Sequence, residues 1–200
     1  MATASEQKEI FENLAPILTH VNGYLEAACV QATEYFFSQK APMDSQLASH
    51  MVRWSFLRLL QAEADLLGIE WIDELGLNGI SFGYHGYHIR VWKADDTDVT
   101  HMASSPTNEA FLAQLLFSWV PSRQPLMNIA ILWDVDSDWH LQSLRVGPPH
   151  KANDRFILDW HFDVTPQVQM LQTGDLESPE RDSTDLHFEL ADEEADDRQG

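Results

Sequence analysis

The spacing of apolar residues changes period along this 200-residue chain, and that change constrains the fold more than any other feature. Over residues 16–67, apolar residues recur with helical spacing, which predicts two amphipathic helices. From residue 79 onward, apolar residues often alternate with polar or small ones, as they do in strands with one buried face. The chain therefore predicts N-terminal helices followed by a sheet.

The segment Lys40–Pro42 separates the two predicted helices, because proline disfavours helical backbone in the residue before it. Asp44 suits the N-terminal cap of the second helix, and Gly68 stands where a C-terminal cap is expected. The first helix has a predicted buried stripe of Ile17, Leu18, Val21, Leu25, Ala28, Cys29, Ala32, Tyr35 and Phe36. The second has a predicted buried stripe of Leu47, Met51, Trp54, Leu57, Leu60, Ala64 and Leu67.

The predicted strands arrive in adjacent pairs. Residues 80–91 alternate on both sides of His85–Gly86, which predicts a β-hairpin that turns there. Met127–Trp133 is almost wholly apolar, as is typical of a central strand covered on both faces. Trp139–Val146 is the expected returning strand, and Phe156–Val164 alternates strictly, which predicts a half-buried strand.

A third helix is predicted between these strands. Ser105–Pro106 has the pattern of a cap followed by proline in the first helical turn. The buried side of this helix is marked by Phe111, Leu112, Leu115, Leu116 and Trp119. The element order predicts an α+β fold, in which an antiparallel sheet of about five strands carries all the helices on one face.

Residues 1–173 are expected to form one domain, with helices over 16–67 and the sheet and third helix over 79–171. Residues 174–200 carry eleven acidic and two basic side chains, so this segment is predicted to be a largely disordered acidic tail. Its alternating Leu186, Phe188 and Leu190 leave open an extra strand or a docking segment.

The charge balance limits the classes of partner. The chain has 12 basic and 32 acidic residues, a net charge of −20, which repels phosphate backbones and anionic membranes. We therefore expect no direct nucleic-acid partner and no membrane partner, whereas a basic protein partner is favoured. The N-terminal residues lack the pattern of a signal peptide, and no apolar run approaches a membrane span, so a cytoplasmic location is expected.

Asp134 and Asp136 follow the apolar strand and form the most enzyme-like pattern. Two aspartates at this spacing can hold Mg²⁺, and the segment locally resembles that of haloacid-dehalogenase-type phosphatases. The same residues also suit an ordinary hairpin turn. A calcium loop is excluded, because Trp139 and Arg145 stand where glycine and glutamate are required.

Other patterns for catalysis or cofactor binding are weak. His85, His88 and His101 are closely spaced, yet zinc sites need three or four converging ligands, and cysteine ligands are missing. The single cysteine, Cys29, lies on the predicted apolar helix face and is read as a core residue. Nucleophile elbows and glycine-rich phosphate loops are also missing, so acyl-transfer and nucleotide chemistry have no support. No cofactor is expected.

The outer face of the predicted sheet offers a candidate binding surface. If Tyr87, Ile89 and Val91 point to the core, then His88, Arg90 and Trp92 point away from it, and Asp159, His161 and Asp163 do likewise on the last strand. Tryptophan beside arginine and histidine is typical of protein interfaces. The alternative is that a loop, the tail or the third helix covers this face.

Four stretches together resemble a known family: His50–Arg53, Gly79–Ser81, Tyr87–Asp95 and Asn128–Asp136. The family consists of uncharacterised actinobacterial proteins encoded beside ImmA/IrrE-type zinc-metallopeptidase proteins, and some of these pairs are regarded as toxin–antitoxin modules. The resemblance covers residues 45–165. It implies an antitoxin-like protein that binds a partner, such as a metallopeptidase-type toxin encoded nearby.

Our leading hypothesis is therefore a non-enzymatic protein-binding module, antitoxin- or immunity-like, that neutralises or regulates a protein partner. The rival hypothesis is a divalent-metal-dependent hydrolase or phosphatase that uses Asp134 and Asp136. A structural domain that forms a homo-oligomer is a third possibility.

Overall fold

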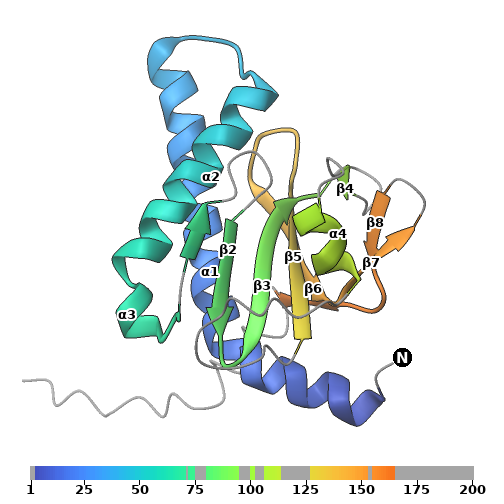
Figure 1. Cartoon of the computed structure of the whole chain (residues 1–200). Helices are drawn as coiled ribbons and strands as arrows, with labels where there is room; N and C mark the ends of the chain where they lie inside the picture. Colours follow the sequence, from blue (N-terminus) through green and yellow to red (C-terminus); the bar gives the residue numbers. More distant parts are fainter. Residues whose placement is uncertain are drawn as a thin grey trace, which may run out of the picture.

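Helices cover both faces of a central β-sheet in the computed structural model of the protein (Figure 1). Two of them, α1 (Ala4–Gln39) and α2 (Ser45–Ala62), cover one face, and α4 (Pro106–Leu112) covers the other. The structure describes residues 3–70, 72–74, 80–94, 100–101, 106–113, 127–152 and 155–164. The predicted acidic tail of residues 174–200, and the predicted buried residues Leu115, Leu116 and Trp119, lie outside these ranges.

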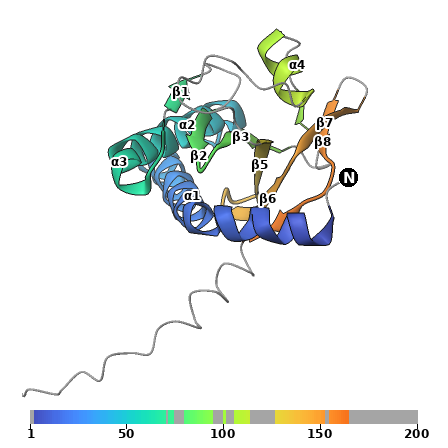
Figure 2. The same cartoon turned by 60° about the horizontal axis from the view of Figure 1, so that its bottom comes forward.

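Helix α1 begins earlier than Pro16, where the first helix was predicted to start. Thr3 caps it, because the Thr3 side chain accepts from the Glu6 backbone N–H while the Glu6 carboxylate accepts from the Thr3 backbone N–H at 2.6 Å. Pro16 lies inside the helix, and its missing N–H gives a physical reason for the bend of α1 seen in Figures 1 and 2. The helix ends at Lys40, which adopts a left-handed conformation.

The second predicted helix is divided into α2 and the short α3 (Ala64–Leu67). Both predicted caps are confirmed: Asp44 accepts from the backbone N–H of Leu47 at 2.7 Å, and Gly68 is left-handed after α3. The predicted buried stripe was displaced, because Leu47 and Trp54 are exposed. The residues that α2 buries are Ala48, Val52, Ser55, Phe56, Leu57 and Leu60.

The main sheet has six strands in the order β1 (Ile72–Glu74), β2 (Ile80–Tyr84), β3 (Tyr87–Lys93), β5 (Met127–Val135), β6 (Leu141–Gly147) and β9 (Phe162–Asp163). The prediction of a purely antiparallel sheet was wrong, because β3 and β5 are parallel. A parallel pair needs a crossover between its strands, and α4 lies in that connection. The remaining neighbours pair antiparallel, so the α+β class is confirmed with a mixed sheet.

The hairpin between β2 and β3 is confirmed at the predicted position. His85 has φ 47° and Gly86 has φ 82°, and positive φ at both central residues characterises the tight turn that suits the twist of two antiparallel strands. The register pairs Tyr84 with Tyr87 on either side of the turn. The hairpin fixes which residues of β3 face each side of the sheet.

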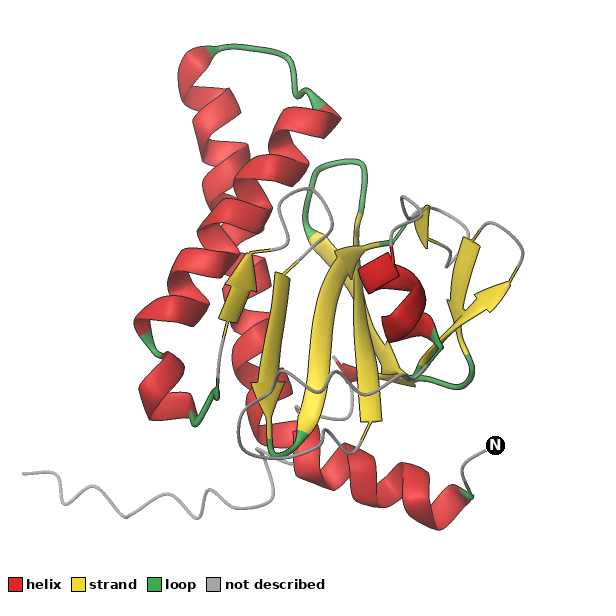
Figure 3. Ribbon diagram, viewed as in Figure 1, coloured by secondary structure: helices red, strands yellow, loops and turns green. Residues whose placement is uncertain are grey.

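The strand predicted over Phe156–Val164 is split between two sheets. Its first part, β8 (Arg155–Leu158), lies between β4 (Thr100–His101) and β7 (Pro149–Ala152) in a small three-stranded sheet (Figure 3). Its last part, β9, pairs with β6 of the main sheet. The link between them passes over Gly147, where an added Cβ would lie 1.9 Å from the backbone oxygen of Trp160, so only glycine fits there.

Two apolar clusters lie on opposite faces of the main sheet. The larger cluster joins α1 and α2 to the sheet residues Phe82, Ile89 and Ile131. The smaller cluster joins α4 and β8 to the sheet through Trp92, Ala94, Phe111, Leu112, Ala130, Leu132 and Phe156. The prediction that all helices share one face was therefore wrong, and Figure 2 shows α1 and α4 on opposite sides of the strands. Among the described residues, no helix is long and apolar enough to cross a membrane.

Candidate functional site

A cluster of polar side chains lies on the sheet face beneath α4. Alternation along the strands places it there, because Phe82 and Ile89 face the larger apolar cluster and their neighbours face the opposite way. We call it the buried polar cluster, and all of its members are buried. They are Ser81 of β2, His88 and Arg90 of β3, Asn108 of α4 and Asn128 of β5.

Ser81 and His88 form a close pair within this cluster. Ser81 Oγ lies 2.7 Å from His88 Nε2. Burial and, to a smaller extent, the neighbouring positive charge of Arg90 lower the pKa of His88 to about 4, while a hydrogen bond with Asn128 opposes the shift. The imidazole is therefore neutral near neutral pH, as a general base would be.

The distance between Ser81 and His88 suits a nucleophile and its general base, but a substrate has no access to the pair. Ser81 and His88 are buried, and the His88 ring contacts Phe111 of α4 edge-to-face at 5.0 Å. A substrate would have to displace α4 to reach the Ser81 hydroxyl. In the described structure the pair is therefore a polar contact within the core.

Arg90 and Asn128 form hydrogen bonds that join α4 to the sheet. Arg90 Nη1 donates to Asn108 Oδ1 at 2.9 Å, and Asn128 Nδ2 donates to the backbone oxygen of Phe111 at 3.0 Å. The guanidinium carbon of Arg90 lies 4.5 Å from the Phe111 ring centroid. These contacts give the buried polar cluster a role in positioning α4.

The predicted surface of His88, Arg90 and Trp92 points away from the N-terminal helices as expected, but these three side chains are buried. Trp92 packs against Phe111 of α4 at 5.4 Å and against Phe156 of β8 at 4.9 Å between ring centroids. The alternative, that the third helix covers this face, is what the structure shows, with β8 adding to the cover.

Asp159, His161 and Asp163 are exposed, as predicted. Asp159 Oδ1 lies 2.5 Å from His150 Nδ1 of β7, and Asp163 stands opposite Arg145 in the sheet register. Strands β5 and β6 separate Asp163 of β9 from β3, so Asp163 and the His88–Trp92 strip do not form one surface. A binding role of these six residues stays a prediction.

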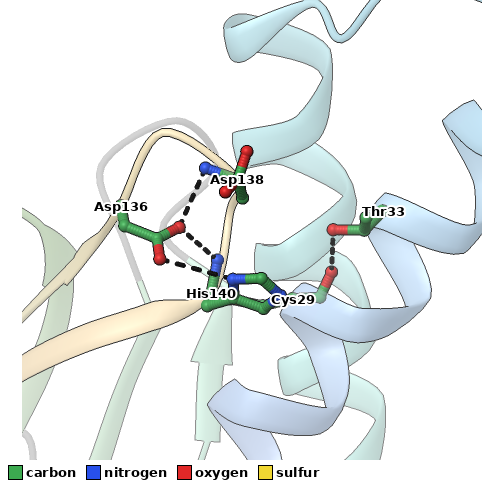
Figure 4. A network of polar contacts seen from close by, with 5 residues as sticks. All are labelled: Cys29, Thr33, Asp136, Asp138 and His140. Carbon is green, nitrogen blue, oxygen red and sulfur yellow. Dashed lines mark hydrogen bonds and ion pairs between the residues drawn. The ribbon is translucent and has the colours of Figure 1, made fainter.

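Asp136 organises the turn between β5 and β6 (Figure 4). Its Oδ1 accepts from the backbone N–H groups of Asp138 and His140, both at 2.9 Å, and its Oδ2 lies 3.3 Å from His140 Nδ1. These hydrogen bonds, led by the one from the His140 backbone, lower the pKa of Asp136. Asp134 Oδ1 accepts from the backbone N–H of Val135 at 2.8 Å.

Both carboxylates therefore have structural tasks in the hairpin. Among the side chains that the structure describes, no group of three or more histidine, cysteine, aspartate or glutamate residues is arranged to hold a metal ion. Of the histidines considered as ligands, His88 lies in the buried polar cluster, and nothing is described of the His101 side chain. The arrangement offers a stabilised turn rather than a metal centre.

Cys29 of α1 is a core residue, as predicted. It is buried, and burial together with the negative charge of Glu26 raises the pKa of its thiol to about 12. Figure 4 shows it on the helix beside the β5–β6 turn, where its backbone oxygen accepts from Thr33 Oγ1 at 3.0 Å. A thiol in this state is a poor nucleophile.

The prediction from sequence missed large apolar side chains that are exposed on the helices. Phe37 of α1 is 86% exposed, Leu66 of α3 is 83% exposed, and Trp54 of α2 is 62% exposed. Val30 lies seven positions before Phe37 on α1 and is 50% exposed. The exposure of Phe37 could have been predicted from the sequence, because the residue falls outside the predicted buried stripe of its helix.

Comparison of the chain with protein-family models, with curated proteins and with solved structures found no significant match. The candidate sites therefore rest on their own geometry. That geometry provides a buried polar cluster, a stabilised acidic turn and exposed apolar side chains on the helices.

Proposed function

We propose that this chain is a non-enzymatic protein-binding module that neutralises or regulates a protein partner, as antitoxins and immunity proteins do. The exposure of Phe37 and Trp54 on neighbouring helices is the observation that carries the proposal. Aromatic side chains dominate the binding energy of protein interfaces when they become buried there. Leaving a large apolar side chain in water costs about 1.5–3 kcal/mol relative to burial, and a partner would recover that free energy.

The charge of the chain supports a protein partner with a basic surface. The net charge of −20 favours rapid association with a positively charged protein. The resemblance to proteins encoded beside metallopeptidase-type proteins suggests which partner to test first. A neighbouring metallopeptidase-type toxin is that partner.

The rival, a metal-dependent hydrolase that uses Asp134 and Asp136, receives no comparable support. Asp136 uses both carboxylate oxygens in the β5–β6 turn, and Asp134 accepts from its neighbour's backbone. A metal ion would have to compete with these contacts. We therefore place the function on the exposed helices rather than on the two aspartates.

The test is affinity capture with the full-length chain. Tagged wild type, Phe37→Ala/Trp54→Ala and the control Leu66→Ala are incubated with native lysate and with the co-expressed neighbouring protein, then separated by size exclusion. We expect a stoichiometric protein with wild type and Leu66→Ala, and its loss with the double variant. A wild-type chain that elutes alone from both mixtures would contradict the proposal.

A further inference from the structure

One exposed face of α1 alternates acidic and apolar side chains. Glu26, Val30, Glu34 and Phe37 are spaced by four, four and three positions, which places them along one side of a helix. All four are exposed, and we call them the α1 outer stripe. The buried residues Leu25, Ala28, Ala32 and Phe36 lie on the opposite side of the same turns.

The α1 outer stripe has no basic neighbour on its own helix. Helix α1 has no lysine or arginine after Lys8, and Lys8 lies 3.6 Å from Glu12 near the start of the helix. The carboxyl end of a helix adds a partial negative charge, and no basic residue occupies the last turn of α1. The nearest basic residue in sequence is Lys40, the C-terminal cap.

The position of the stripe leaves it accessible. Figure 1 shows the carboxyl end of α1 and the start of α2 projecting beyond the end of the main sheet. Phe36 beside the stripe is buried, whereas Phe37 is 86% exposed, so the two neighbouring rings divide the helix into an inner and an outer face. A partner can therefore reach the outer face without any rearrangement of the core.

We infer that the α1 outer stripe is the docking surface for an amphipathic basic helix of the protein partner. Apolar side chains of that helix pack on Val30 and Phe37, and its lysine or arginine side chains lie against Glu26 and Glu34. The inference rests on the proposed protein-binding function and specifies the partner's chemistry. Charge complementarity distinguishes this occupant from the alternatives.

A second copy of the chain is a poorer occupant of the stripe. Two copies would bring together two molecules that each carry a net charge of −20, with the glutamates of one stripe close to those of the other. An acidic segment as the occupant of the stripe would be repelled by Glu26 and Glu34 in the same way. A basic helix instead neutralises Glu26 and Glu34 while it covers the apolar side chains.

The test uses full-length protein and a synthetic probe. A fluorescein-labelled peptide of about 18 residues, built from leucine and lysine with helical spacing, is titrated with wild type, and binding is followed by anisotropy. A matched peptide has glutamate in place of lysine. We expect the lysine peptide to bind and the glutamate peptide to bind at least about tenfold more weakly, because only its charges differ.

Variants then locate the binding. Val30→Ala/Phe37→Ala should lower the affinity for the lysine peptide at least about tenfold, since two apolar contacts are removed. Glu26→Gln/Glu34→Gln should lower the affinity for the lysine peptide a few-fold at low salt. The difference in affinity from wild type should disappear at about 1 M salt. Leu66→Ala, an equally exposed apolar residue on α3, should leave binding unchanged.

The outcomes separate this inference from the proposed function. Equal binding by wild type and Val30→Ala/Phe37→Ala, or an equal loss with Leu66→Ala, would overturn the docking surface. The protein-binding function would still stand if the native partner were captured. Because the substituted side chains are exposed, unchanged circular dichroism and thermal unfolding are expected, and loss of fold is checked directly.

Discussion

Two arginine–tryptophan pairs of similar geometry have opposite surroundings in this molecule. The guanidinium carbon of Arg90 lies 5.8 Å from the Trp92 ring centroid, beneath α4 and β8. The corresponding distance from Arg58 to Trp54 is 5.5 Å, on the solvent side of α2. The same residue types thus hold a core together in one place and remain accessible in the other. Their chemistry alone did not determine which pair a partner could reach.

Replacing Arg90 with alanine tests the role of the buried pair most directly. We expect Arg90→Ala to lower the free energy of unfolding by about 3–5 kcal/mol, because it removes a large buried side chain and the donor to Asn108 Oδ1. Urea unfolding at neutral pH measures the change. Arg90→Met, which keeps most of the packing, should cost less.

The matched change on the surface is Arg58→Ala, which should alter the free energy of unfolding by about 1 kcal/mol or less. Its side chain is exposed and contacts Trp54 from the solvent side. Equal losses of unfolding free energy for Arg58→Ala and Arg90→Ala would show that the buried pair does not stabilise the fold more than the exposed pair.

A second test uses pH, because His88 is buried in a neutral state. Its pKa is about 4 in the folded protein and 6.5 as the ordinary value, so the unfolded chain binds more protons between these values. Stability is therefore lost as the pH falls below about 6.5. We expect His88 to contribute a loss of about 2 kcal/mol between pH 7 and pH 5 in urea unfolding.

Replacing His88 isolates its contribution to the pH dependence of stability. His88→Gln should reduce the loss of stability between pH 7 and pH 5 relative to that of wild type. A wild-type chain whose stability does not change between these pH values would contradict a buried neutral His88.

Features with a local cause could be predicted from the sequence. The β2–β3 turn follows from Gly86, the cap of α2 follows from Asp44, and the central strand follows from the apolar run Met127–Trp133. Each depends on a few neighbouring residues, and the structure confirms each of them. The α+β class follows from the order of these elements.

Features with a non-local cause could not be predicted in this way. Alternation shows that His88, Arg90 and Trp92 share a face, yet it does not show that α4 and β8 cover that face. The buried stripe of α2 was displaced for a related reason: small residues such as Ala48 pack inward, while the larger Trp54 faces solvent. Whether His88, Arg90 and Trp92 are exposed could not be predicted from the sequence, because exposure depends on such packing.

The two faces of α1 can be compared through thiol reactivity. Cys29 is buried with its pKa raised to about 12, so its reaction with a disulfide reagent at pH 8 should be slow until the protein unfolds. A cysteine introduced by Phe37→Cys in a Cys29→Ala background should react at least about a hundredfold faster. Similar rates in the folded state would mean that the inner face of α1 opens readily.

The smallest expected effect is that of replacing Trp54, the exposed tryptophan of α2. Trp54→Ala should change the free energy of unfolding by about 0.5 kcal/mol or less, because the ring is 62% exposed and contributes little to the core. Thermal unfolding measures the change, and Phe56→Ala on the buried side of α2 is the matched control, with an expected loss of about 3–5 kcal/mol. A loss above about 1.5 kcal/mol for Trp54→Ala would assign that ring to packing. The exposed aromatic residues would then no longer support a binding surface, since their exposure would not reflect freedom from the fold.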